Sequence, residues 1–368
     1  MKLGIIGLPN VGKSTLFNAL TKAGAEAANY AFCTIDPNVG IVPVPDARLD
    51  SLAKIYKPEK TTPATVEFVD IAGLVKGASK GEGLGNKFLS HIREVDAIVH
   101  VVRCFGGEGV IHVEGNVDPV RDADTVNTEL ILADIETLER RIDRVKKQLK
   151  GDASLREELE TLEKAADGMN GGTAAGQLEL SENEKCLLGE SFLLSLKPMI
   201  YAANIDEESL RSPLGENIFY SSLEKKAMSE GAEIIAVCAG LESELAELDD
   251  GERQSYINDL YPGLGLEDTG LRKLINSSYS ALGLISFLTA GPKEVRAWTI
   301  KKGTKAPAAA GKIHTDFEKG FIRAEVVSYC NLMAKGSFLA AKEAGLVKSE
   351  GREYIMSDGD VALFRFNV

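Results

Sequence analysis

A glycine-bearing segment near the amino terminus has the residue types that bind a polyphosphate. Residues 7–14 read Gly-Leu-Pro-Asn-Val-Gly-Lys-Ser and fit the pattern G-x-x-x-x-G-K-[ST]. Gly7 and Gly12 allow a tight turn that brings backbone N–H groups close to phosphate oxygens. Lys13 is expected to lie along the outer phosphates, and Ser14 to offer its hydroxyl to Mg²⁺, which prefers oxygen ligands. The segment therefore predicts a site for a nucleoside phosphate and magnesium.

Two later segments could complete the site around the terminal phosphate. Residues 30–38 occupy the position of the first switch of a phosphate-loop NTPase, where a Thr contacts Mg²⁺ and the terminal phosphate. Thr34 is the candidate there, and a plain structural loop is the alternative. Residues 70–73, Asp-Ile-Ala-Gly, follow an expected strand. Asp70 can therefore hold Mg²⁺ through a water while Gly73 follows the phosphate.

The residue that would activate the attacking water is not the usual one. Leu74 stands where many GTPases place a water-orienting Gln, and an apolar side chain cannot orient water. Hydrolysis must therefore depend on another group or be slow. His112, in the loop 104–116, titrates near neutral pH and could position a water or take a proton. A solvated surface histidine is the alternative interpretation.

A fourth segment concerns the base. Residues 204–207 read Asn-Ile-Asp-Glu at the end of an expected strand, where most GTPases carry N-K-x-D. Ile205 removes the Lys stem that packs on the base, and Glu207 moves the carboxylate outward by one methylene. The guanine donors would be left badly paired in a closed pocket, so the preference for guanine should collapse. Adenine becomes plausible, because its amine could donate to a backbone carbonyl or to Asn204, whereas Asp206 should point elsewhere.

These segments need a sheet that brings their ends together. Apolar and β-branched runs predict its strands, and an apolar helix face follows the phosphate loop from residue 16 to residue 21. The strands are expected at residues 3–6, 39–44, 65–69, 97–103, 198–203 and 233–238. The carboxyl ends of parallel strands share one edge, which is where open α/β sheets bind ligands. The sequence thus predicts an α/β phosphate-loop NTPase fold with a mostly parallel sheet.

A helical insertion is expected to interrupt this sheet. After the cap and first-turn proline of Asp118-Pro119, apolar residues recur every three or four positions to about residue 196. A break at 170–173 predicts a long antiparallel coiled-coil hairpin, with a second arm that is helical over 178–196. Six of the eleven residues 140–150 are basic. They could contact a phosphate backbone, for which RNA is the expected source, or form only a solvated helix face.

The C-terminal residues predict a separate small unit. Strand patterns at 284–289, 294–300 and 321–328 and a helix over 332–345 indicate an α+β unit of the β-grasp type. The Ala/Pro run 306–310 has no assignment from its pattern. The expected domains are residues 1–120 with 197–282 for nucleotide binding, 121–196 for the helical insertion and 283–366 for the C-terminal unit.

Composition and charge restrict the classes of function. The chain has 42 basic and 55 acidic residues and a net charge of −13, yet from Gly283 onward it has 13 basic and 9 acidic residues. An acidic body is repelled by nucleic acid except through local patches, so DNA is not an expected partner. No apolar run approaches the roughly 20 residues that span a bilayer, so no membrane association is expected. The first strand begins at once and leaves no room for a signal peptide.

The cysteines favour a reducing compartment. All five are scattered without a C-x-x-C pair, which argues against a disulfide frame or a zinc site. The sequence therefore predicts a cytoplasmic protein.

Taken together, the motifs resemble a known family. The phosphate loop, the Phe-Cys-Thr-Ile-Asp-Pro-Asn segment, the run from Asp70 to Asn86 and the Asn-Ile-Asp-Glu variant are similar to those of the YchF / Obg-like ATPases. The resemblance covers essentially the whole chain and implies an OBG-type G domain, a helical insertion and a C-terminal TGS domain. It implies that Ser14 and Thr34 ligate Mg²⁺, and His112 becomes the candidate for the missing catalytic role. The residues that it assigns to the phosphates are Asn10, Val11, Gly12, Lys13, Ser14 and Thr15, and Asn10 also matches a K⁺ ligand.

The resemblance implies a slow ATP hydrolase that acts as a nucleotide-dependent switch and binds the ribosome or its RNA, as a monomer. Two alternatives remain open. One is a GTP-hydrolysing G protein that tolerates a degenerate base loop. The other is a non-catalytic RNA-binding adaptor that uses the β-grasp unit and the basic run 140–150, and in which the nucleotide is only a structural ligand.

Overall fold

The computed structural model describes residues 1–25, 38–71, 84–106, 115–261 and 265–367. The chain divides into two compact units. The first comprises Met1–Ile41 with Glu67–Ser278, and the second comprises Val42–Val66 with Tyr279–Val368. The second unit thus contains a segment that the sequence assigned to the nucleotide-binding domain.

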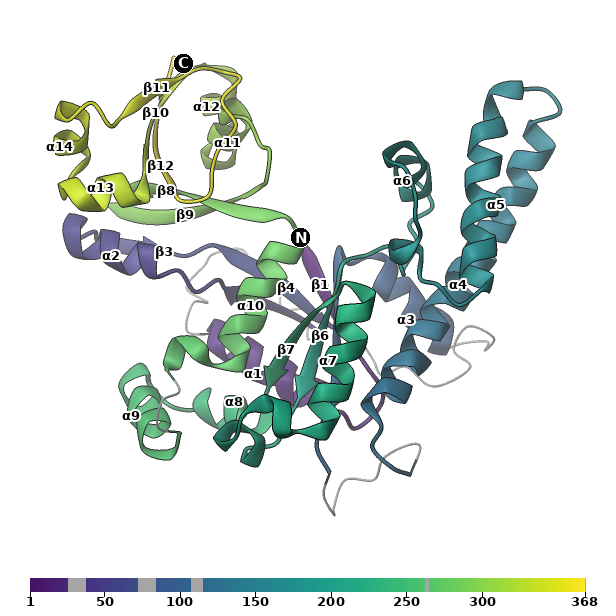
Figure 1. The fold of residues 1–368 in the computed structure, drawn as a ribbon. Coiled ribbons are helices and arrows are strands. Elements are labelled where there is room, and N and C mark those ends of the chain that lie inside the picture. The colour runs from purple at the N-terminus through teal and green to yellow at the C-terminus, as the bar shows by residue number, and fades with distance from the viewer. Residues whose placement is uncertain (26–37, 72–83, 107–114, 262–264, 368) are drawn as a thin grey trace. The chain divides into compact units, whose positions relative to one another are not determined.

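The first unit is built on a six-stranded sheet with the order β2-β4-β1-β5-β6-β7 (Figure 1). Its strands are β1 (Lys2–Ile6), β2 (Val39–Pro43), β4 (Thr65–Asp70), β5 (Ala97–Arg103), β6 (Met199–Asn204) and β7 (Glu233–Val237). The pairings of β1 with β4 and β5, of β5 with β6 and of β6 with β7 are all parallel. The predicted parallel α/β sheet is therefore confirmed. Every residue of β5 is buried, as expected for a central strand covered on both faces.

Helices flank this sheet and fix the edge at which the motifs meet. They are α1 (Lys13–Ala25), α3 (Leu84–Arg93), α7 (Ile218–Glu230), α8 (Ala239–Leu245), α9 (Asp250–Leu260) and α10 (Gly270–Ala281). Helix α1 contacts β1 and α8, whereas α7 contacts β6 and β7. Single 3₁₀ turns occur at Ala153–Leu155, Ala175–Gln177, Glu208–Arg211, Leu214–Glu216 and Leu266–Asp268.

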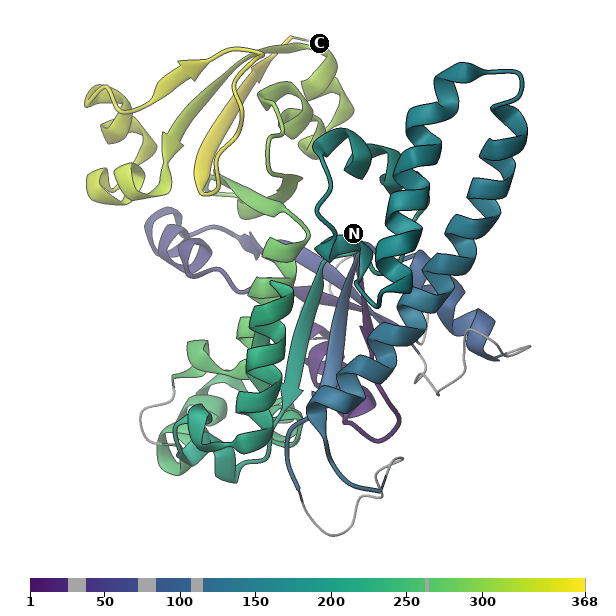
Figure 2. The same cartoon turned by 45° about the vertical axis from the view of Figure 1, so that its right-hand side comes forward.

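The helical insertion projects beyond the sheet in both views (Figures 1 and 2). Helix α4 (Pro119–Gln148) begins at the predicted cap, where the Asp118 carboxylate accepts from the Arg121 N–H and Pro119 occupies the first turn. Helix α5 (Arg156–Asn170) returns along it. A buried apolar cluster joins the arms through Leu138, Ile142, Val145, Leu162, Ala165 and Met169. In the described part of the chain, no helix is both long and apolar enough to cross a membrane.

The predicted helix over 178–196 is wrong for most of its length. Only Glu182–Gly189 (α6) is helical, after a capping box formed by Ser181 and Glu184. Beyond α6 the buried Asp134 carboxylate of α4 accepts from the N–H groups of Leu194 and Ser195, each at 2.7 Å. These two N–H groups therefore bond to a side chain that is distant in sequence, and the chain leaves the helical path although its apolar residues keep a helical spacing.

The second unit has a sheet with the order β11-β10-β12-β8-β9-β3. Its strands are β3 (Lys60–Thr62), β8 (Leu284–Ala290), β9 (Glu294–Lys301), β10 (Phe321–Ser328), β11 (Lys348–Glu350) and β12 (Asp360–Phe366). Its helices are α2 (Ala47–Tyr56), α11 (Ala306–Ile313), α12 (Thr315–Lys319), α13 (Tyr329–Lys335) and α14 (Phe338–Glu343). Three pairings are antiparallel, whereas β12–β8 and β3–β9 are parallel.

Two helix assignments in this unit differ from the sequence expectations. The unassigned run 306–310 begins α11, with its proline in the first turn, and buries three alanines against the sheet core. The single helix expected over 332–345 is broken into α13 and α14. Gly336 takes a left-handed φ of 74° and ends α13, and the Ser337 side chain then caps α14.

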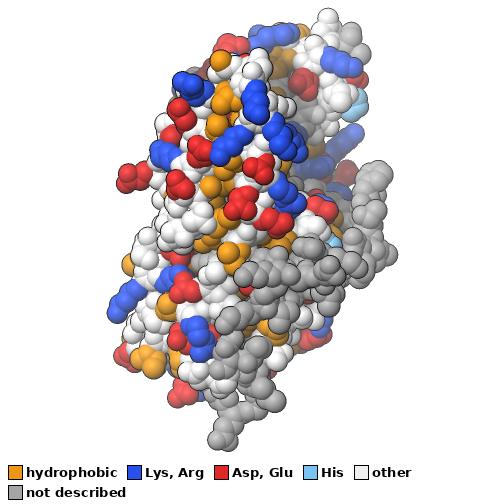
Figure 3. Space-filling model, turned by 90° about the vertical axis from the view of Figure 1, so that its right-hand side faces the viewer, with side chains coloured by type: hydrophobic (Ala, Val, Ile, Leu, Met, Phe, Trp, Pro, Cys, Tyr) orange, Lys and Arg blue, Asp and Glu red, His pale blue; other side chains and the backbone are white. Residues whose placement is uncertain are grey.

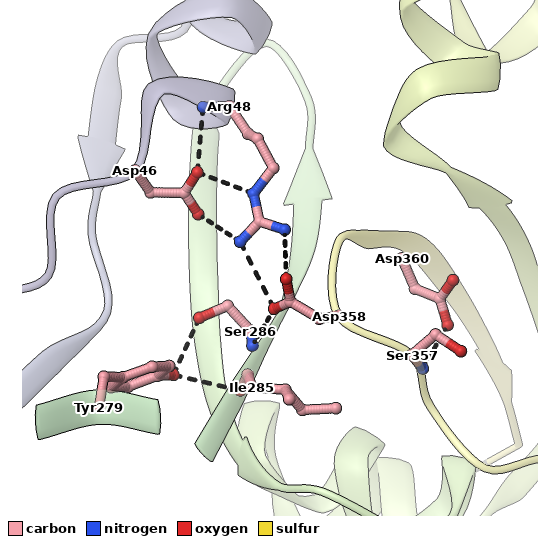
Figure 4. Close-up of polar contacts among 8 residues, drawn as sticks. All are labelled: Asp46, Arg48, Tyr279, Ile285, Ser286, Ser357, Asp358 and Asp360. Atoms are coloured by element: carbon pink, nitrogen blue, oxygen red, sulfur yellow. Dashed lines mark hydrogen bonds and ion pairs between the residues drawn. The ribbon is translucent and has the colours of Figure 1, made fainter. Parts of the chain in front are cut away.

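The segment 42–66 is fastened to the second unit by side chains as well as by β3. Figure 4 shows Arg48, at the start of α2, held between Asp46 and Asp358. Its Nη1 lies 2.7 Å from Asp358 Oδ2, and Asp358 Oδ1 also accepts from the Ser286 N–H at 2.9 Å. These hydrogen bonds raise the pKa of the Arg48 guanidinium above its ordinary value. One guanidinium thus joins α2, β8 and the turn before β12.

Candidate nucleotide-binding site

The phosphate loop lies between β1 and α1 in a conformation that requires its glycines. Gly7 and Gly12 have φ values of 150° and 95°, and Asn10 is also left-handed at 61°. A Cβ on Gly7 would lie 2.4 Å from the Val101 carbonyl oxygen, which is backbone of the neighbouring strand and cannot move aside. Helix α1 then starts at Lys13. Its first N–H groups and positive dipole end therefore adjoin the loop, the arrangement that binds phosphate.

Lys13 is folded back onto its own loop. The side chain is 8% exposed, and its Nζ donates to the Leu8 carbonyl at 2.6 Å. Burial lowers the pKa of Lys13 to about 8, although the Asp70 carboxylate favours the charged form. A polyphosphate in the loop would supply the negative charge that a buried ammonium lacks, so the side chain is suited to pair with an anion.

Asp70 ends β4 at the same edge of the sheet. The register pairs Asp70 with Ile5, which lies two residues before Gly7 at the start of the phosphate loop. Burial raises the pKa of Asp70, and the Lys13 ammonium opposes that rise. Ser14 and Thr15 are exposed at the start of α1 and leave their hydroxyls accessible. A serine hydroxyl and a carboxylate fit Mg²⁺, which usually keeps several waters and takes its remaining ligands from phosphates.

Asn204 has a role that the sequence did not reveal. Its side chain is 6% exposed; Nδ2 donates to the Val11 carbonyl at 2.9 Å, and Oδ1 accepts from the Ala239 N–H at 3.1 Å. The amide therefore joins the phosphate loop to the start of α8. It also explains Gly12, because a Cβ there would lie 2.3 Å from Asn204 Nδ2. Both ends of the amide are engaged within the protein.

The rest of the base loop is arranged differently from an N-K-x-D loop. Ile205 is 1% exposed and lies in the apolar cluster under α7. The Asp206 carboxylate accepts from the N–H and hydroxyl of Ser209, at 3.0 and 2.6 Å, so it does point elsewhere as expected. The exposed Glu207 accepts a hydrogen bond from the Tyr261 hydroxyl at 3.0 Å. Tyr261 gave no signal in the sequence, because it lies 54 positions away.

A cavity opens beside this loop. Its volume is about 440 Å³, and its walls include Phe105, Asp206, Ser209 and Asn217. This volume falls in the ordinary range for a small-molecule site, roughly 300–1,000 Å³. Thr34, Gly73 and His112 lie outside the described residues, as do Leu74 and most of the glycine-rich run after it.

Among the described residues, no group of three or more His, Cys, Asp or Glu side chains could hold a metal ion without further ligands. A magnesium ion at Ser14 and Asp70 would therefore take phosphate and water oxygens as its remaining ligands.

Comparisons with known proteins agree with this geometry. A family model named MMR_HSR1, described as a 50S ribosome-binding GTPase, matches residues 2–148, and a model named YchF-GTPase_C, described as a protein of unknown function, matches residues 284–367. The ribosome-binding ATPase YchF of Bacillus subtilis (strain 168) is 55% identical over 367 residues, which cover 99% of each chain. The protein of the same name from Escherichia coli O157:H7 is 53% identical over 368 residues, or 100% of this chain and 99% of that one.

A solved structure is also similar over the whole chain. The Schizosaccharomyces pombe YchF GTPase superposes with a TM-score of 0.89 at 40% identity, covering 99% of this chain and 97% of that one.

Proposed function

Because the chain belongs to the YchF family, we propose that it is an ATP hydrolase whose nucleotide state controls its association with the ribosome in the cytoplasm. The relatives from Bacillus subtilis and Escherichia coli are named ribosome-binding ATPases. The matching family model and the fission-yeast structure carry the word GTPase instead. The names thus leave the choice of base to be argued from the site.

The observation that carries the proposal is an intact phosphate site beside an altered base loop. Lys13 and the amino-terminal end of α1 supply charge and N–H donors to a triphosphate. Ser14, Asp70 and Thr34 are the proposed oxygen ligands of Mg²⁺, directly or through water. Asn10 is the proposed K⁺ ligand. The metal would neutralise charge on the outer phosphates.

The base loop supports adenine. Ile205 cannot cover a base, because its side chain is in the core. Asp206 is occupied by Ser209, and Glu207 by Tyr261. Both carboxylates are thus oriented by hydrogen bonds within the protein, and guanine would have to share the carboxylate that it uses with Ser209 or Tyr261. Adenine needs no such acceptor, and a backbone carbonyl can take its amine. Both ends of the Asn204 amide already form hydrogen bonds within the protein, so a backbone carbonyl is the proposed acceptor for the adenine amine.

Calorimetric titration with ATP and GTP analogues, with Mg²⁺ and K⁺ present, tests the base. We expect ATP to bind at least tenfold more tightly, a difference of about 1.4 kcal/mol. Glu207→Asp should reduce the difference between the ATP and GTP affinities by shortening the side chain that carries the carboxylate. Glu244→Asp is the matched control, because Glu244 is an exposed glutamate that likewise accepts from a tyrosine hydroxyl. Tenfold tighter binding of GTP by the wild-type protein would establish the GTPase alternative instead.

Ribosome association is proposed to use basic side chains of the insertion among its contacts. Basic and acidic side chains are interspersed on this face (Figure 3). Arg141 is bound to Glu158 at 2.6 Å and Lys146 to Glu163 at 2.8 Å, so these two have structural partners. Arg144 and Lys147 are exposed, and within the described residues neither has a carboxylate partner.

Co-sedimentation with ribosomes tests this surface. Arg144→Glu with Lys147→Glu should weaken binding at low salt. The control is Lys185→Glu with Lys225→Glu, which reverses two exposed charges elsewhere in the same unit. Equal binding by all three proteins would mean that the basic run is only a solvated helix face. Single-turnover hydrolysis with and without ribosomes separates the adaptor alternative, for which no turnover is expected in either condition.

A further inference from the structure

A second group of basic side chains lies on the sheet of the C-terminal unit. Glu325 of β10 is 6% exposed by its side chain and is surrounded by three cations. Arg323 Nη2 lies 3.4 Å and Lys342 Nζ 3.3 Å from Glu325 Oε1, and Arg365 Nη2 lies 3.1 Å from Oε2. We call these four residues the Glu325 cluster. It joins β10, β12 and α14, which lie in the C-terminal unit in Figure 1.

The strand register places the two arginines side by side. Arg323 of β10 is the direct partner of Arg365 of β12, and Glu325 is the partner of Leu363. Like charges directly opposite on neighbouring strands destabilise a sheet. One carboxylate between three cations leaves the cluster with two positive charges in excess. The sheet therefore carries a local charge that its own residues do not balance.

No other acid of these strands shares that face. By alternation, the remaining residues on it are Val327, Val361, Leu363 and Ser349. The acid on α14 is Glu343, next to Lys342 in the helix and thus about 100° further around its axis. The excess charge is therefore confined to one sheet face of a protein whose net charge is −13.

The three cations are oriented but remain accessible. The side chains of Arg323, Lys342 and Arg365 are 52%, 52% and 50% exposed. Although burial alone would raise the pKa of Glu325, hydrogen bonds from Arg365 and Lys342 lower it, so the carboxylate stays charged and holds the cations in place. Half-exposed ion pairs of this kind add little stability. Stability alone is a weak reason for three of them on one carboxylate.

We infer that the Glu325 cluster is a contact site for the phosphate backbone of single-stranded RNA. The guanidinium groups keep donors directed at solvent that suit phosphate oxygens. Leu363 is 42% exposed on the same face and offers apolar contact for a ribose or base. An acidic protein segment would also match this charge; the proposed association with the ribosome, whose RNA presents phosphates, favours RNA. The inference rests on the proposed ribosome association, for which it names one contact.

Salt dependence of RNA binding tests the inference on the full-length protein. The variant is Arg323→Gln with Lys342→Gln, which leaves Arg365 to hold Glu325. The probe is a fluorescent 20-nucleotide oligouridylate without nucleotide or ribosomes, so the result does not depend on the ATPase proposal. Each phosphate contact to a single strand contributes about −0.7 to the slope of log K against log salt. From 50 to 200 mM salt, the wild type should therefore lose about sevenfold more affinity than the variant.

The matched control is Lys301→Gln with Lys302→Gln, which removes two exposed charges from the same unit at the end of β9. It should keep the wild-type slope. Glu325→Gln acts in the opposite direction: with one more net positive charge ~7 Å from a phosphate, RNA should bind about threefold more tightly. Thermal unfolding checks that each variant is folded.

Three outcomes would overturn the inference. The first is a wild-type slope for Arg323→Gln with Lys342→Gln. The second is weaker RNA binding by folded Glu325→Gln. The third is displacement of the RNA by a polyglutamate of equal charge at lower concentration, which would identify an acidic protein as the partner.

Discussion

Replacing Asn204 by alanine should separate the phosphate loop from the base loop. The substitution removes two buried hydrogen bonds, to the Val11 carbonyl at 2.9 Å and from the Ala239 N–H at 3.1 Å. Val11 and Ala239 are 2% and 3% exposed, so both backbone groups would be left without water. Each orphaned group costs about 1–3 kcal/mol, so the two together give about 2–6 kcal/mol of lost stability, and less if a water enters the space.

Urea unfolding of the nucleotide-free protein measures this loss directly. A loss of 3 kcal/mol would lower the melting temperature by about 6–12 °C for a unit of this size. Affinity for ATP should fall as well, because the carbonyl at Val11 belongs to the loop that holds the phosphates. Asn183→Ala, on an exposed position of α6, is the control and should stay within about 0.5 kcal/mol of wild type. If Asn204→Ala behaves like that control in both assays, the linking role is refuted.

Three further predictions concern a pKa, a glycine and an ion pair. The folded pKa of Lys13, about 8, lies below its ordinary value of 10.5, so the unfolded chain binds more protons than the folded protein between these pH values. The nucleotide-free protein should therefore gain stability from pH 8 to pH 10.5. Urea titrations at both pH values should show this gain for the wild type and not for Lys13→Met. Gly7→Ala forces a Cβ to 2.4 Å from a backbone oxygen and should abolish nucleotide binding by calorimetry, whereas Gly189→Ala, with no atom within 4 Å of its Cβ, should bind normally. Arg141→Met should speed hydrogen exchange in α5 by releasing Glu158, whereas Arg140→Met, whose side chain is 67% exposed, should not; equal rates in the two would contradict the structural role.

The sheet of the first unit could be predicted because its signals are local. Each buried parallel strand is a short apolar run, and Gly7 and Gly12 indicate the positive φ angles of the phosphate loop directly. The same holds for the start of α4, where Asp118 and Pro119 act on the nearest turn. Lys13 and Asp70 likewise lie at the edge that the spacing of strands and motifs predicted.

The features that the sequence did not predict share one physical cause: each depends on an interaction between residues that are distant along the chain. The second arm of the insertion has helical periodicity, but Asp134 takes two of its backbone N–H groups from about 60 positions away. Asn204 meets the Val11 carbonyl across 193 positions. Strand β3 has only three residues, of which Thr62 alone is buried, and pairs with β9 more than 200 positions later. No pattern within a window of neighbouring residues contains these interactions.

Residues 42–66 belong to the same compact unit as the C-terminal residues, so a single cut in the chain does not separate the two units. A truncation after residue 282 would remove β9, which pairs with β3, and Asp358, which forms an ion pair with Arg48. Strand β3 would then have an unpaired edge of the kind that promotes aggregation. The complementary fragment, which starts at residue 283, would lack β3, the strand that pairs with β9 at one edge of its sheet. A soluble C-terminal fragment would need α2 and β3 supplied as a peptide or fused through a linker. Fragments that correspond to the two units therefore need three boundaries in the chain instead of one.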